Sequence, residues 1–361
     1  MIVITGSAGF IGSHLADYFA AKKQRLLLVD EPSFFRERPY FDVGSASLWD
    51  FASGQQGKPA THKIIDRNYF LKVLGAIGPN SNPSDAKAKE NVLIPPGERI
   101  EAIIHIGACT DTAEQRLDYL DKWNVSYTKS IWQWCTKHKV PLIFASSGAT
   151  YGAGENGFSD SWETTMKLKP LNPYGQSKQD FDVWAKKEID AGRAPPHWDG
   201  LKFFNVYGYR EAHKGPMASA VLHAYRHIMR TGTCKLFRSH NPKVKDGEQS
   251  RDFIHVNDIV KLVDHFFTAR PASGLYNCGT GKARTFSALM AAIFDTLDRP
   301  MKVEWIDTPE QYRKAYQYFT EADMTHTLSA GYTAPFLNLS EGVAEYVRWL
   351  QKHERPEKTF H

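Results

Sequence analysis

A tyrosine and a lysine four positions apart have the residue types and the spacing for proton transfer. In the run Tyr174-Gly175-Gln176-Ser177-Lys178, the first and last side chains would lie on one face of a helix. A free phenol, with a pKa of about 10, is a poor base at neutral pH, but a neighbouring ammonium favours the phenolate and lowers that pKa. Ser147 follows a predicted strand, where its hydroxyl could hydrogen-bond the reacting oxygen. We therefore predict that Tyr174, Lys178 and Ser147 are catalytic.

A glycine-rich loop near the N-terminus predicts a dinucleotide site. The run from Thr5 to Gly12 reads TGSAGFIG, follows a β-branched strand and opens a helix. Glycines let backbone amides approach a pyrophosphate, and the helix N-terminus adds partial positive charge. A tight turn that binds nothing is the less favoured interpretation, because strand, loop and helix occur in the order that dinucleotide binding requires. The predicted contacts are Gly6, Gly9, Phe10, Ile11 and Gly12.

The residues around the second predicted strand do not decide whether the cofactor carries a 2′-phosphate. Asp30 ends this strand and Glu31 follows it. An acid here favours a free ribose 2′-hydroxyl, as in NAD, whereas a basic neighbour accommodates the 2′-phosphate of NADP. Basic neighbours are also present, namely Arg36, Arg38 and Arg67. We predict that all five contact the cofactor, and the sequence does not choose between NAD and NADP.

Alternating strands and helices must position these residues. Apolar runs predict strands at residues 2–4, 26–29, 64–65, 102–105, 142–145 and 201–204, and helical spacing predicts helices at 11–22, 117–138 and 174–191. Continuous apolar strands separated by helices indicate a parallel sheet covered on both faces. We expect an α/β protein with a doubly wound parallel sheet of the Rossmann type, which binds ligands at the carboxyl edge of its strands.

The chain after residue 205 becomes irregular and rich in Gly, His and Arg, which predicts a smaller, mixed substrate-binding lobe. We expect the dinucleotide-binding domain to comprise residues 1–205, with 250–280 and about 318–332 returning to it. The lobe would comprise 206–249, 281–317 and 333–361. Residues 78–97 predict an exposed, mobile loop, 240–249 form a second polar insertion, and 355–361 predict a frayed tail.

The composition excludes several classes of protein. The net charge is a mild +5, with basic residues spread among acids, so we expect no nucleic-acid partner. No run of about eighteen apolar residues predicts a membrane span, and no secretory signal is evident, so we expect a cytoplasmic protein. Four widely spaced cysteines predict free thiols. His223 and His227 lie four apart but lack further ligands nearby, so no metal site is expected.

The glycine loop, Ser147 and the Tyr-x-x-x-Lys pair together resemble the extended short-chain dehydrogenases/reductases, over nearly the whole chain. Four further runs resemble the ADP-L-glycero-D-manno-heptose 6-epimerase family: FNVYGYREAHKGPMAS at 204–219, KLFRS at 235–239, RDF at 251–253 and YQYFTEAD at 316–323. The runs HIGAC at 105–109 and ASSGATYG at 145–152 agree with it. The HKGxMAS portion discriminates best, because most relatives within the larger group lack it.

This resemblance implies an isomerase that inverts C6 of an ADP-linked heptose, for lipopolysaccharide core synthesis. Tyr174 would exchange a proton with the C6 hydroxyl while hydride passes to a tightly bound nicotinamide cofactor, usually NADP. A transient C6 ketone would then turn its other face and be reduced again. The family's proposed second acid–base lysine carries over to Lys214, for which a phosphate contact is the alternative role. The resemblance also implies a homo-oligomer, a pentamer in the type enzyme, and no membrane partner.

The resemblance also implies a set of ligand contacts. Arginines suit the pyrophosphate of such a substrate, because the guanidinium fork matches its oxygens. The implied substrate contacts are Asn205, His213, His223, Phe237, Arg238, Ser239, His240, Arg251 and Tyr316. The implied further cofactor contacts are Ile106, Gly107, Ala108, Cys109, Thr110, Asn124 and Val206, together with Lys178.

Two departures and two alternatives accompany this hypothesis. Pro216 replaces a small hydroxyl residue that often contacts substrate in the family, and the charge of Glu31 would oppose a 2′-phosphate. One alternative is another sugar-nucleotide enzyme of this fold, such as a UDP-hexose 4-epimerase. A 4,6-dehydratase is less favoured, because Gly148-Ala149 replaces the acidic pair expected beside the catalytic hydroxyl. The other alternative is a non-catalytic dinucleotide-binding protein, although such proteins commonly lose the Tyr or the Lys.

Overall fold

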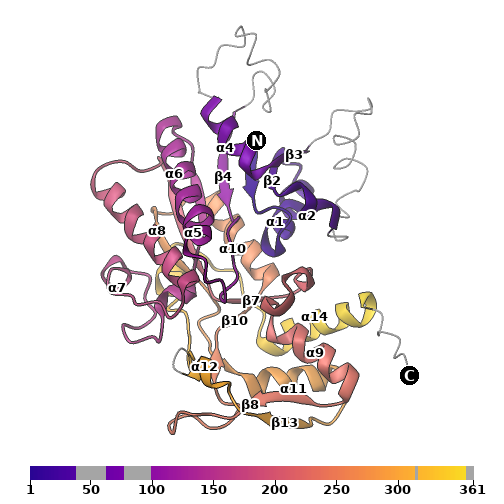
Figure 1. Ribbon diagram of the computed structural model, residues 1–361. Helices are drawn as coiled ribbons and strands as arrows, with labels where there is room; N and C mark the ends of the chain where they lie inside the picture. The colour runs from indigo at the N-terminus through magenta and orange to yellow at the C-terminus, as the bar shows by residue number, and fades with distance from the viewer. Residues whose placement is uncertain (38–61, 77–98, 314–315, 355–361) are drawn as a thin grey trace.

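A parallel sheet of seven strands forms the centre of the molecule (Figure 1). The computed structural model describes residues 1–37, 62–76, 99–313 and 316–354. The strand order is β11-β6-β5-β4-β1-β2-β3, and every neighbouring pair is parallel. In chain order the strands are β1 (Ile2–Thr5), β2 (Leu26–Asp30), β3 (His62–Asp66), β4 (Ala102–His105), β5 (Leu142–Ser147), β6 (Trp198–Phe203) and β11 (Gly274–Cys278).

The strand order reverses at β1, which pairs with β2 on one side and β4 on the other. Ile2 lies opposite Leu26 in the first pair and opposite Ala102 in the second. Because the chain winds outward in both directions from this strand, a crevice opens beyond the carboxyl ends of β1 and β4. The predicted doubly wound parallel sheet is confirmed, and the edge strand β11 is an addition that the sequence analysis did not identify.

Helices cover both faces of the sheet, and alternate strand residues enter two separate cores. Ile2 and Ile4 join the core beneath α1 (Phe10–Ala21) and α10 (Val256–Ala269). Val3 joins the opposite core, beneath α4 (Arg67–Ala76), α6 (Tyr127–His138) and α8 (Pro173–Asp190). The short helix α2 (Pro32–Glu37) follows β2.

The predicted helix at 117–138 is interrupted by a wider turn. It consists of α5 (Leu117–Leu120), a π-helical segment η2 (Asp121–Ser126) and α6. A π-turn inserts an extra residue per turn and is often found at functional sites. Here the segment contains Trp123 and Asn124, which are both buried and both close to the dinucleotide loop or its crevice.

A third core lies outside the sheet, where α9 (Ala220–Thr231), α11 (Phe286–Thr296) and α14 (Leu339–His353) pack together (Figure 1). Strand β8 (Cys234–Phe237) pairs with β13 (Val303–Ile306) below these helices. The smaller remaining elements are η3 (Gly148–Tyr151), α7 (Trp162–Thr165), β7 (Asn205–Tyr207), η4 (Ala212–Met217), β9 (Ser250–Arg251), β10 (Phe253–His255), β12 (Arg284–Thr285), α12 (Glu310–Arg313) and α13 (Thr325–Ser329).

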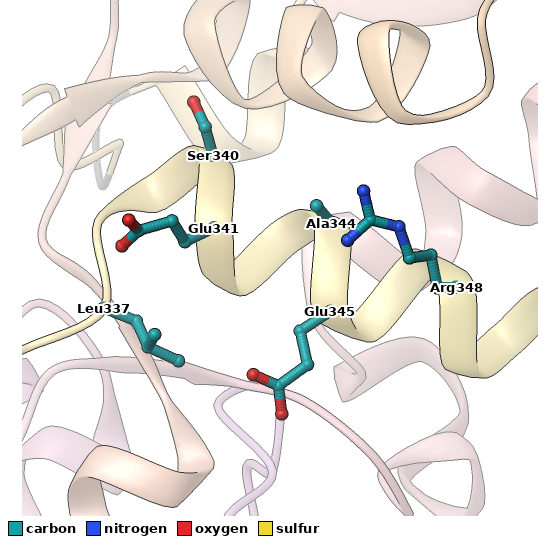
Figure 2. A pocket seen from close by; sticks show the side chains of 6 residues that line it. All are labelled: Leu337, Ser340, Glu341, Ala344, Glu345 and Arg348. Carbon is teal, nitrogen blue, oxygen red and sulfur yellow. The ribbon is translucent and has the colours of Figure 1, made fainter.

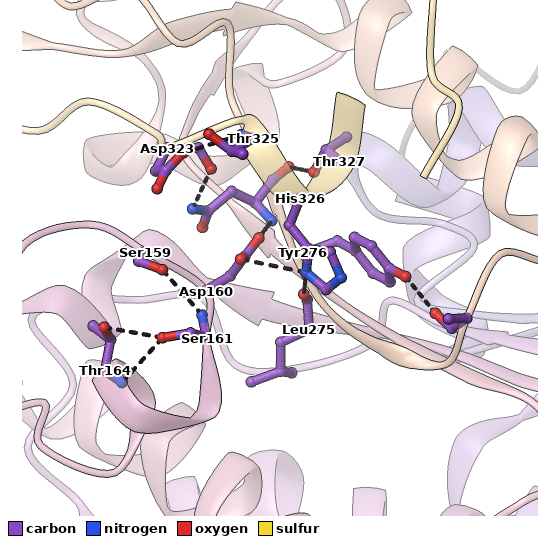
Figure 3. A network of polar contacts seen from close by, with 12 residues as sticks. Ser159, Asp160, Ser161, Thr164, Leu275, Tyr276, Asp323, Thr325, His326 and Thr327 are labelled. Carbon is purple, nitrogen blue, oxygen red and sulfur yellow. Dashed lines mark hydrogen bonds and ion pairs between the residues drawn. The ribbon is translucent and has the colours of Figure 1, made fainter. Parts of the chain in front are cut away.

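A polar network joins the segment around α13 to the edge strand β11 (Figure 3). The carboxylate of Asp160 accepts a hydrogen bond of 2.7 Å from the backbone N–H of Asn277 and lies 3.4 Å from the Nδ1 atom of His326. The side-chain amide of Asn277 donates to the carbonyl of Asp323 at 2.9 Å, and Thr327 donates to the carbonyl of Asn277 at 2.7 Å. These contacts bring residues 323–327 back to the sheet after the excursion through the outer helices.

Several sequence expectations fall outside the described residues. The loop expected at 78–97 and the tail expected at 355–361 lie there, as does Arg38. The polar insertion at 240–249 is described, and it forms turns between β8 and β9. In the portions of the chain that the structure describes, no helix is both long and apolar enough to cross a bilayer.

Candidate active site

A cleft of about 930 Å³ opens at the carboxyl ends of β1, β4 and β5. One wall comes from the dinucleotide loop and the strand ends, and the other from η4, the start of α9 and Phe286 of α11. The predicted catalytic residues all line this cleft, namely Ser147, Tyr174, Lys178 and Lys214. The fold therefore brings together residues that lie up to 67 positions apart in the sequence, from Ser147 to Lys214.

The dinucleotide loop is packed too tightly to carry side chains at two of its glycines. A Cβ atom on Gly6, whose φ is +68°, would lie 2.6 Å from the backbone of Gly107, and one on Gly12 would overlap the carbonyl oxygen of Gly6. This close packing leaves the amide-rich start of α1 open to the cleft. All five predicted contacts in this loop line the cleft. The residues present thus fit a pyrophosphate held at the helix N-terminus.

The end of β2 places one acid inside the protein and one at its surface. Asp30 is buried, and its two carboxylate oxygens accept hydrogen bonds from the backbone N–H groups of Ala8 at 2.9 Å and Glu31 at 2.8 Å. Glu31 lies 3.7 Å from the guanidinium of Arg67, which stacks over the Trp123 ring at 3.8 Å. Asp30 and Arg67 line the cleft. The side chain of Arg36 lies outside the described part of the chain.

Tyr174 reaches Ser147 because the start of α8 packs closely against η3. Asn172 caps the helix, accepting a 2.7 Å hydrogen bond from the N–H of Gly175, and Pro173 occupies the first turn, where its missing N–H costs nothing. A Cβ atom on Gly175 would lie 2.8 Å from the carbonyl oxygen of Ala149, so only glycine allows this approach.

Two opposing effects act on the phenol of Tyr174. Burial raises its pKa above the ordinary value, and a hydrogen bond from the hydroxyl of Ser147 lowers it in part. The Ser147 oxygen also accepts the N–H of Ala149 at 3.1 Å, which fixes its position. The two hydroxyls therefore lie together at the cleft, positioned to share one substrate oxygen.

Lys178 lies one turn further along α8 and is almost completely buried. Its ammonium donates a 2.9 Å hydrogen bond to the carbonyl of Ala145 on β5. Burial lowers the pKa of Lys178 to about 8, while the carboxylate of Asp182 raises it in part. The ammonium of Lys178 can therefore lose its proton at a pH closer to neutral than an exposed lysine can.

A buried ion pair supports the catalytic helix from behind. Lys202 on β6 and Asp182 on α8 are both fully buried, and their charged atoms lie 2.7 Å apart. The carboxylate of Asp182 also accepts the hydroxyl of Ser146 at 2.8 Å, and Lys202 donates to Thr150 at 3.0 Å. These contacts fix α8 against the strand ends that carry Ser147.

A chain of hydrogen bonds links the dinucleotide loop to the π-helical segment. Thr5 contacts the Nδ1 atom of His105 at 2.6 Å, and the Nε2 atom of this ring contacts Thr128 at 2.9 Å. Because Thr128 donates its proton to the carbonyl of Asn124, the Nε2 atom of His105 must be the donor to Thr128. Thr5 also accepts the N–H of Gly107 at 3.2 Å. With this assignment, the side-chain polar atoms of Thr5, His105 and Thr128 all have hydrogen-bond partners.

Asn124, a predicted cofactor contact, lies behind the cleft. Its side chain accepts the N–H of Cys109 at 2.8 Å and donates to the carbonyl of the same residue at 3.0 Å. It therefore shapes the loop after β4, whose residues Ile106, Gly107, Ala108, Cys109 and Thr110 line the cleft together with Val206.

The predicted substrate contacts fall into two groups. Asn205 and His213 line the cleft. Arg251 lies beside it, buried, with its guanidinium 5.7 Å from the rings of both Phe286 and Tyr316. Phe237 packs edge-on against Tyr316, with ring centroids 6.3 Å apart.

Like Arg251, Phe237 and Tyr316, the remaining four predicted contacts do not line the cleft. Arg238 is exposed, its guanidinium 3.3 Å from Asp246. Ser239 and His240 follow it in the same loop, and the backbone N–H of His240 donates to the hydroxyl of Tyr318. His223 is exposed on α9, with its Nε2 atom 3.3 Å from the carbonyl of Pro216.

Sequence reasoning missed several residues of the cleft. Trp123, Tyr127, Thr112, Met217 and Phe286 line it. The hydroxyl of Thr112 contacts the sulfur of Met217 at 3.4 Å, which joins the two walls. Met217 belongs to the HKGxMAS run, but the other four carry no recognisable motif, and only the three-dimensional path of the chain brings them together.

A second, shallower depression lies along α14, away from the cleft (Figure 2). Leu337 and Glu345 contribute to its lining. The carboxylate of Glu345 accepts hydrogen bonds from the hydroxyl of Tyr209 and, at 3.1 Å, from the side chain of Asn257. These contacts give Glu345 a structural role, in which it joins α14 to the start of α10 and to the segment before η4.

Comparison with known proteins agrees with this arrangement. The sequence model of the NAD dependent epimerase/dehydratase family matches residues 2–279. The ADP-L-glycero-D-manno-heptose-6-epimerase of Fusobacterium nucleatum subsp. nucleatum is 39% identical over 368 residues, which cover 98% of this chain and 99% of that protein. The protein of the same name from Nitratidesulfovibrio vulgaris is 46% identical over 252 residues, which cover 69% of this chain and 76% of that protein.

Solved structures share the fold over almost the whole length. ADP-L-glycero-D-manno-heptose-6-epimerase of Helicobacter pylori has a TM-score of 0.69 and 25% identity, and the match covers 97% of this chain and 96% of that one. UDP-glucose 4-epimerase of Thermus thermophilus, in complex with NAD, also has a TM-score of 0.69, at 19% identity over 98% and 99% of the two chains. The family match, the full-length relatives and the shared fold lead to one conclusion: this chain belongs to the NAD dependent epimerase/dehydratase family.

Proposed function

We propose that this chain is an isomerase that inverts C6 of an ADP-linked heptose. The observation that carries the proposal is that Tyr174 and Lys214, from different parts of the sequence, line one cleft with the dinucleotide loop. An enzyme that inverts a carbinol must exchange the hydroxyl proton in both orientations of the sugar, and two proton-transfer groups in one cleft can serve one orientation each. The names of the Fusobacterium and Nitratidesulfovibrio relatives support the choice of sugar.

A nicotinamide dinucleotide, when bound, would supply the acceptor and donor of hydride. The loop from Gly6 to Gly12 and the segment 106–110 would hold it, and Asp30, Arg67 and Val206 line the same part of the cleft. We propose NADP, following the family resemblance. The pairing of Glu31 with Arg67 opposes a 2′-phosphate, which makes NAD the alternative. Mass measurement of the nucleotide that the denatured protein releases decides between them.

In this proposal, Tyr174 takes the proton from the sugar hydroxyl in one orientation and Lys214 serves the other. Ser147 donates a hydrogen bond to the same sugar oxygen and holds it beside the phenol. Lys178, as an ammonium, favours the phenolate once a ligand draws it from the carbonyl of Ala145. The sugar must then turn within the cleft, which requires a firm grip on the ADP end of the substrate.

Arg251 would provide that grip. It is buried, its guanidinium lies 5.7 Å from the rings of Phe286 and Tyr316, and no acidic side chain is within ion-pair distance of it in the described ranges. Burial lowers its pKa to about 10, so the guanidinium stays charged at neutral pH and attracts an anion such as a diphosphate. We propose Phe237, Arg238, Ser239, His240, His213, His223, Asn205 and Tyr316 as further substrate contacts, on the family resemblance.

We further propose the two-part division of the chain given by its sequence, with a dinucleotide-binding domain and a substrate-binding lobe. Assembly as a homo-oligomer, a pentamer by resemblance to the type enzyme, belongs to the same proposal. The enzyme would act in the cytoplasm, where nicotinamide dinucleotides and nucleotide sugars are available together, for the synthesis of lipopolysaccharide core heptose.

The test compares two substrates on the purified protein. ADP-D-glycero-D-manno-heptose and UDP-galactose are incubated separately, and the proton resonances of each sugar are followed by NMR. We expect the C6 epimer of the heptose to appear, and the galactose to remain unchanged. Conversion of UDP-galactose alone would favour the 4-epimerase alternative, and conversion of neither by protein that carries its nucleotide would favour a non-catalytic role.

A further inference from the structure

A carboxylate with no role in the proposed mechanism lies close to the segment His213-Lys214-Gly215, here called the HKG segment. Glu211 is completely buried, although it precedes a segment that faces the open cleft. Burial of a carboxylate is costly unless its oxygens are hydrogen-bonded or paired with a positive charge. The contacts of Glu211 therefore indicate what it is for.

Three partners surround this carboxylate. The backbone N–H and the hydroxyl of Ser219 donate to its two oxygens, at 2.7 and 2.5 Å. The hydroxyl of Tyr346, on α14, hydrogen-bonds to it as well. The ammonium of Lys214, three residues further along, lies 3.8 Å away. Ser219 is also the N-cap of α9, so one carboxylate joins η4, α9 and α14.

The ammonium of Lys214 lies between this carboxylate and the dinucleotide loop. On the side of α1, it faces the ring of Phe10 at 5.2 Å from the centroid. The nearest charge on α1 towards this segment, Asp17, is paired with Arg210 at 2.5 Å. Ser219 at the start of α9 and Tyr346 on α14 contact the carboxylate of Glu211, and neither carries a formal charge. Among the described groups that face Lys214, Glu211 is thus the one with an opposite charge.

We propose that Glu211 is the positioning residue of Lys214, and that its buried carboxylate holds the ammonium at the wall of the cleft, protonated and ready to donate. The inference rests on the proposed function, because it assigns Lys214 a proton to give. The electrostatics agree: burial lowers the pKa of Lys214, and Glu211 is the group that raises it in part. The proposal makes Lys214 a proton donor rather than only a phosphate contact.

The competing explanation is that Glu211 only holds the backbone of this segment in place, by accepting the hydrogen bonds from Ser219. The two explanations separate in a measurement of the protonation of Lys214 itself. Full-length protein, with the nucleotide it carries, is exposed to a trace of isotope-labelled acetic anhydride over a pH series, and acetylation of Lys214 is quantified by peptide mass spectrometry. Only the free amine reacts, so the midpoint of the series reports when Lys214 loses its proton. The exposed Lys137 provides an internal standard.

In Glu211→Gln, which keeps the shape and removes the charge, the midpoint for Lys214 should fall by about one pH unit. The matched control is Ser219→Ala, which removes a hydrogen bond to the carboxylate and the cap of α9 but leaves the charge; its midpoint should equal that of the parent protein. Glu211→Asp restores a charge at greater distance, so its midpoint should lie between those of parent and Gln variant. This third variant also serves if Glu211→Gln does not fold.

An unchanged midpoint in Glu211→Gln, or in Glu211→Asp where only that variant folds, would overturn the proposal, whatever the activity. A fall of the same size in Ser219→Ala would also overturn it, because the loss of shape would then explain the effect. If the midpoint falls as expected but the parent protein does not convert ADP-heptose, the positioning role stands and the proposed function fails. The two results are read from different measurements and cannot be confused.

Discussion

Protonation at the level of single side chains determines what the cleft can do. Tyr174, whose pKa burial raises, depends on Ser147 and on a neighbouring cation to become a base. Lys178 is that cation in the proposal, although its ammonium bonds to the carbonyl of Ala145 in this structure. The hydroxyl of a bound ribose would compete with the carbonyl of Ala145 for this ammonium, because the hydroxyl and the carbonyl both accept hydrogen bonds. The hydrogen-bond partner of Lys178 thus depends on which ligand occupies the cleft.

Removal of the phenol hydroxyl tests this set directly. Tyr174→Phe should lower kcat about 10²- to 10⁴-fold, with little change in the amount of bound nucleotide, because the ring still fills its place. Turnover of ADP-heptose followed by NMR, and the absorbance of released nucleotide, measure the two quantities. Tyr225→Phe, a buried residue of α9 that does not line the cleft, is the matched control and should keep the parent rate. A Tyr174→Phe protein as fast as the parent would remove Tyr174 from the mechanism.

The sequence predicts the residues of the site better than it predicts their neighbours. Tyr174, Lys178 and the glycine loop carry local patterns of residue type and spacing, so they are visible without a structure. Lys202 and Asp182 carry none, and Glu211 lies within the 204–219 run without any sign of its role, because the importance of these residues comes from burial and from their partners. The family resemblance predicts that Arg238 contacts the substrate, whereas in the structure this side chain is exposed and lies beside Asp246.

At the scale of elements, the close packing of the start of α1 against the turn after β1 sets the shape of the dinucleotide loop. Gly12→Ala should weaken nucleotide binding at least about tenfold, equal to about 1.4 kcal/mol, because the added methyl group overlaps the carbonyl oxygen of Gly6. Isothermal titration of NAD and NADP measures the loss. Gly192→Ala is the control: its φ of +70° strains an alanine, but nothing lies within 4 Å of the added carbon and the residue does not line the cleft, so this variant should bind nucleotide normally. Equal affinities would show that the loop can relax without cost.

The attachment of α8 to the sheet depends on the buried pair Lys202–Asp182. Lys202→Met leaves an unpaired carboxylate in the interior, and should lower the free energy of unfolding by about 3–5 kcal/mol. Urea unfolding, followed by tryptophan fluorescence, checks this. The double variant Lys202→Met/Asp182→Leu removes both charges and should recover a large part of the loss. A single variant within about 1 kcal/mol of the parent protein would mean that the pair is not a structural anchor.

The elements of the sheet could be predicted because each strand is a short apolar run between helical patterns. The interruption at Asp121–Ser126 could not, since its residues fit a regular helix; in the structure, Trp123 of this segment lines the cleft and Asn124 bonds to the loop after β4. Strand β11 has the sequence GLYNC, in which a glycine and an asparagine interrupt the apolar residues, so no apolar run identifies it as a strand of the sheet.

Across the whole molecule, three buried histidines couple stability to pH. Burial lowers the pKa of His105 to about 3, and those of His14 and His255 to about 4. Their unfolded pKa is about 6.5, so below this value the unfolded chain binds protons that the folded protein rejects. Stability is therefore fully present above pH 6.5 and falls as the pH drops towards 4, by up to about 1.4 kcal/mol per pH unit for each histidine.

His105→Gln removes one of these groups, so the loss of unfolding free energy between pH 6.5 and 4.5 should be less steep in this variant than in the parent protein. Urea unfolding at several pH values gives the slopes. The exposed His240 is the control, and His240→Gln should keep the parent slope. Parallel slopes for His105→Gln and the parent would mean that His105 takes up its proton in the folded state as well.

The proposed reaction inverts one carbon of a nucleotide sugar by removing and returning the same hydrogen. The most direct measurement is conversion of ADP-D-glycero-D-manno-heptose in heavy water, with the isotope content of C6 read by NMR and mass spectrometry. We expect that the C6 epimer forms and that its C6 position keeps its original hydrogen, while the exchangeable hydroxyl protons are replaced. Deuterium at C6 of the product, or no epimer from protein that carries its nucleotide, would contradict it.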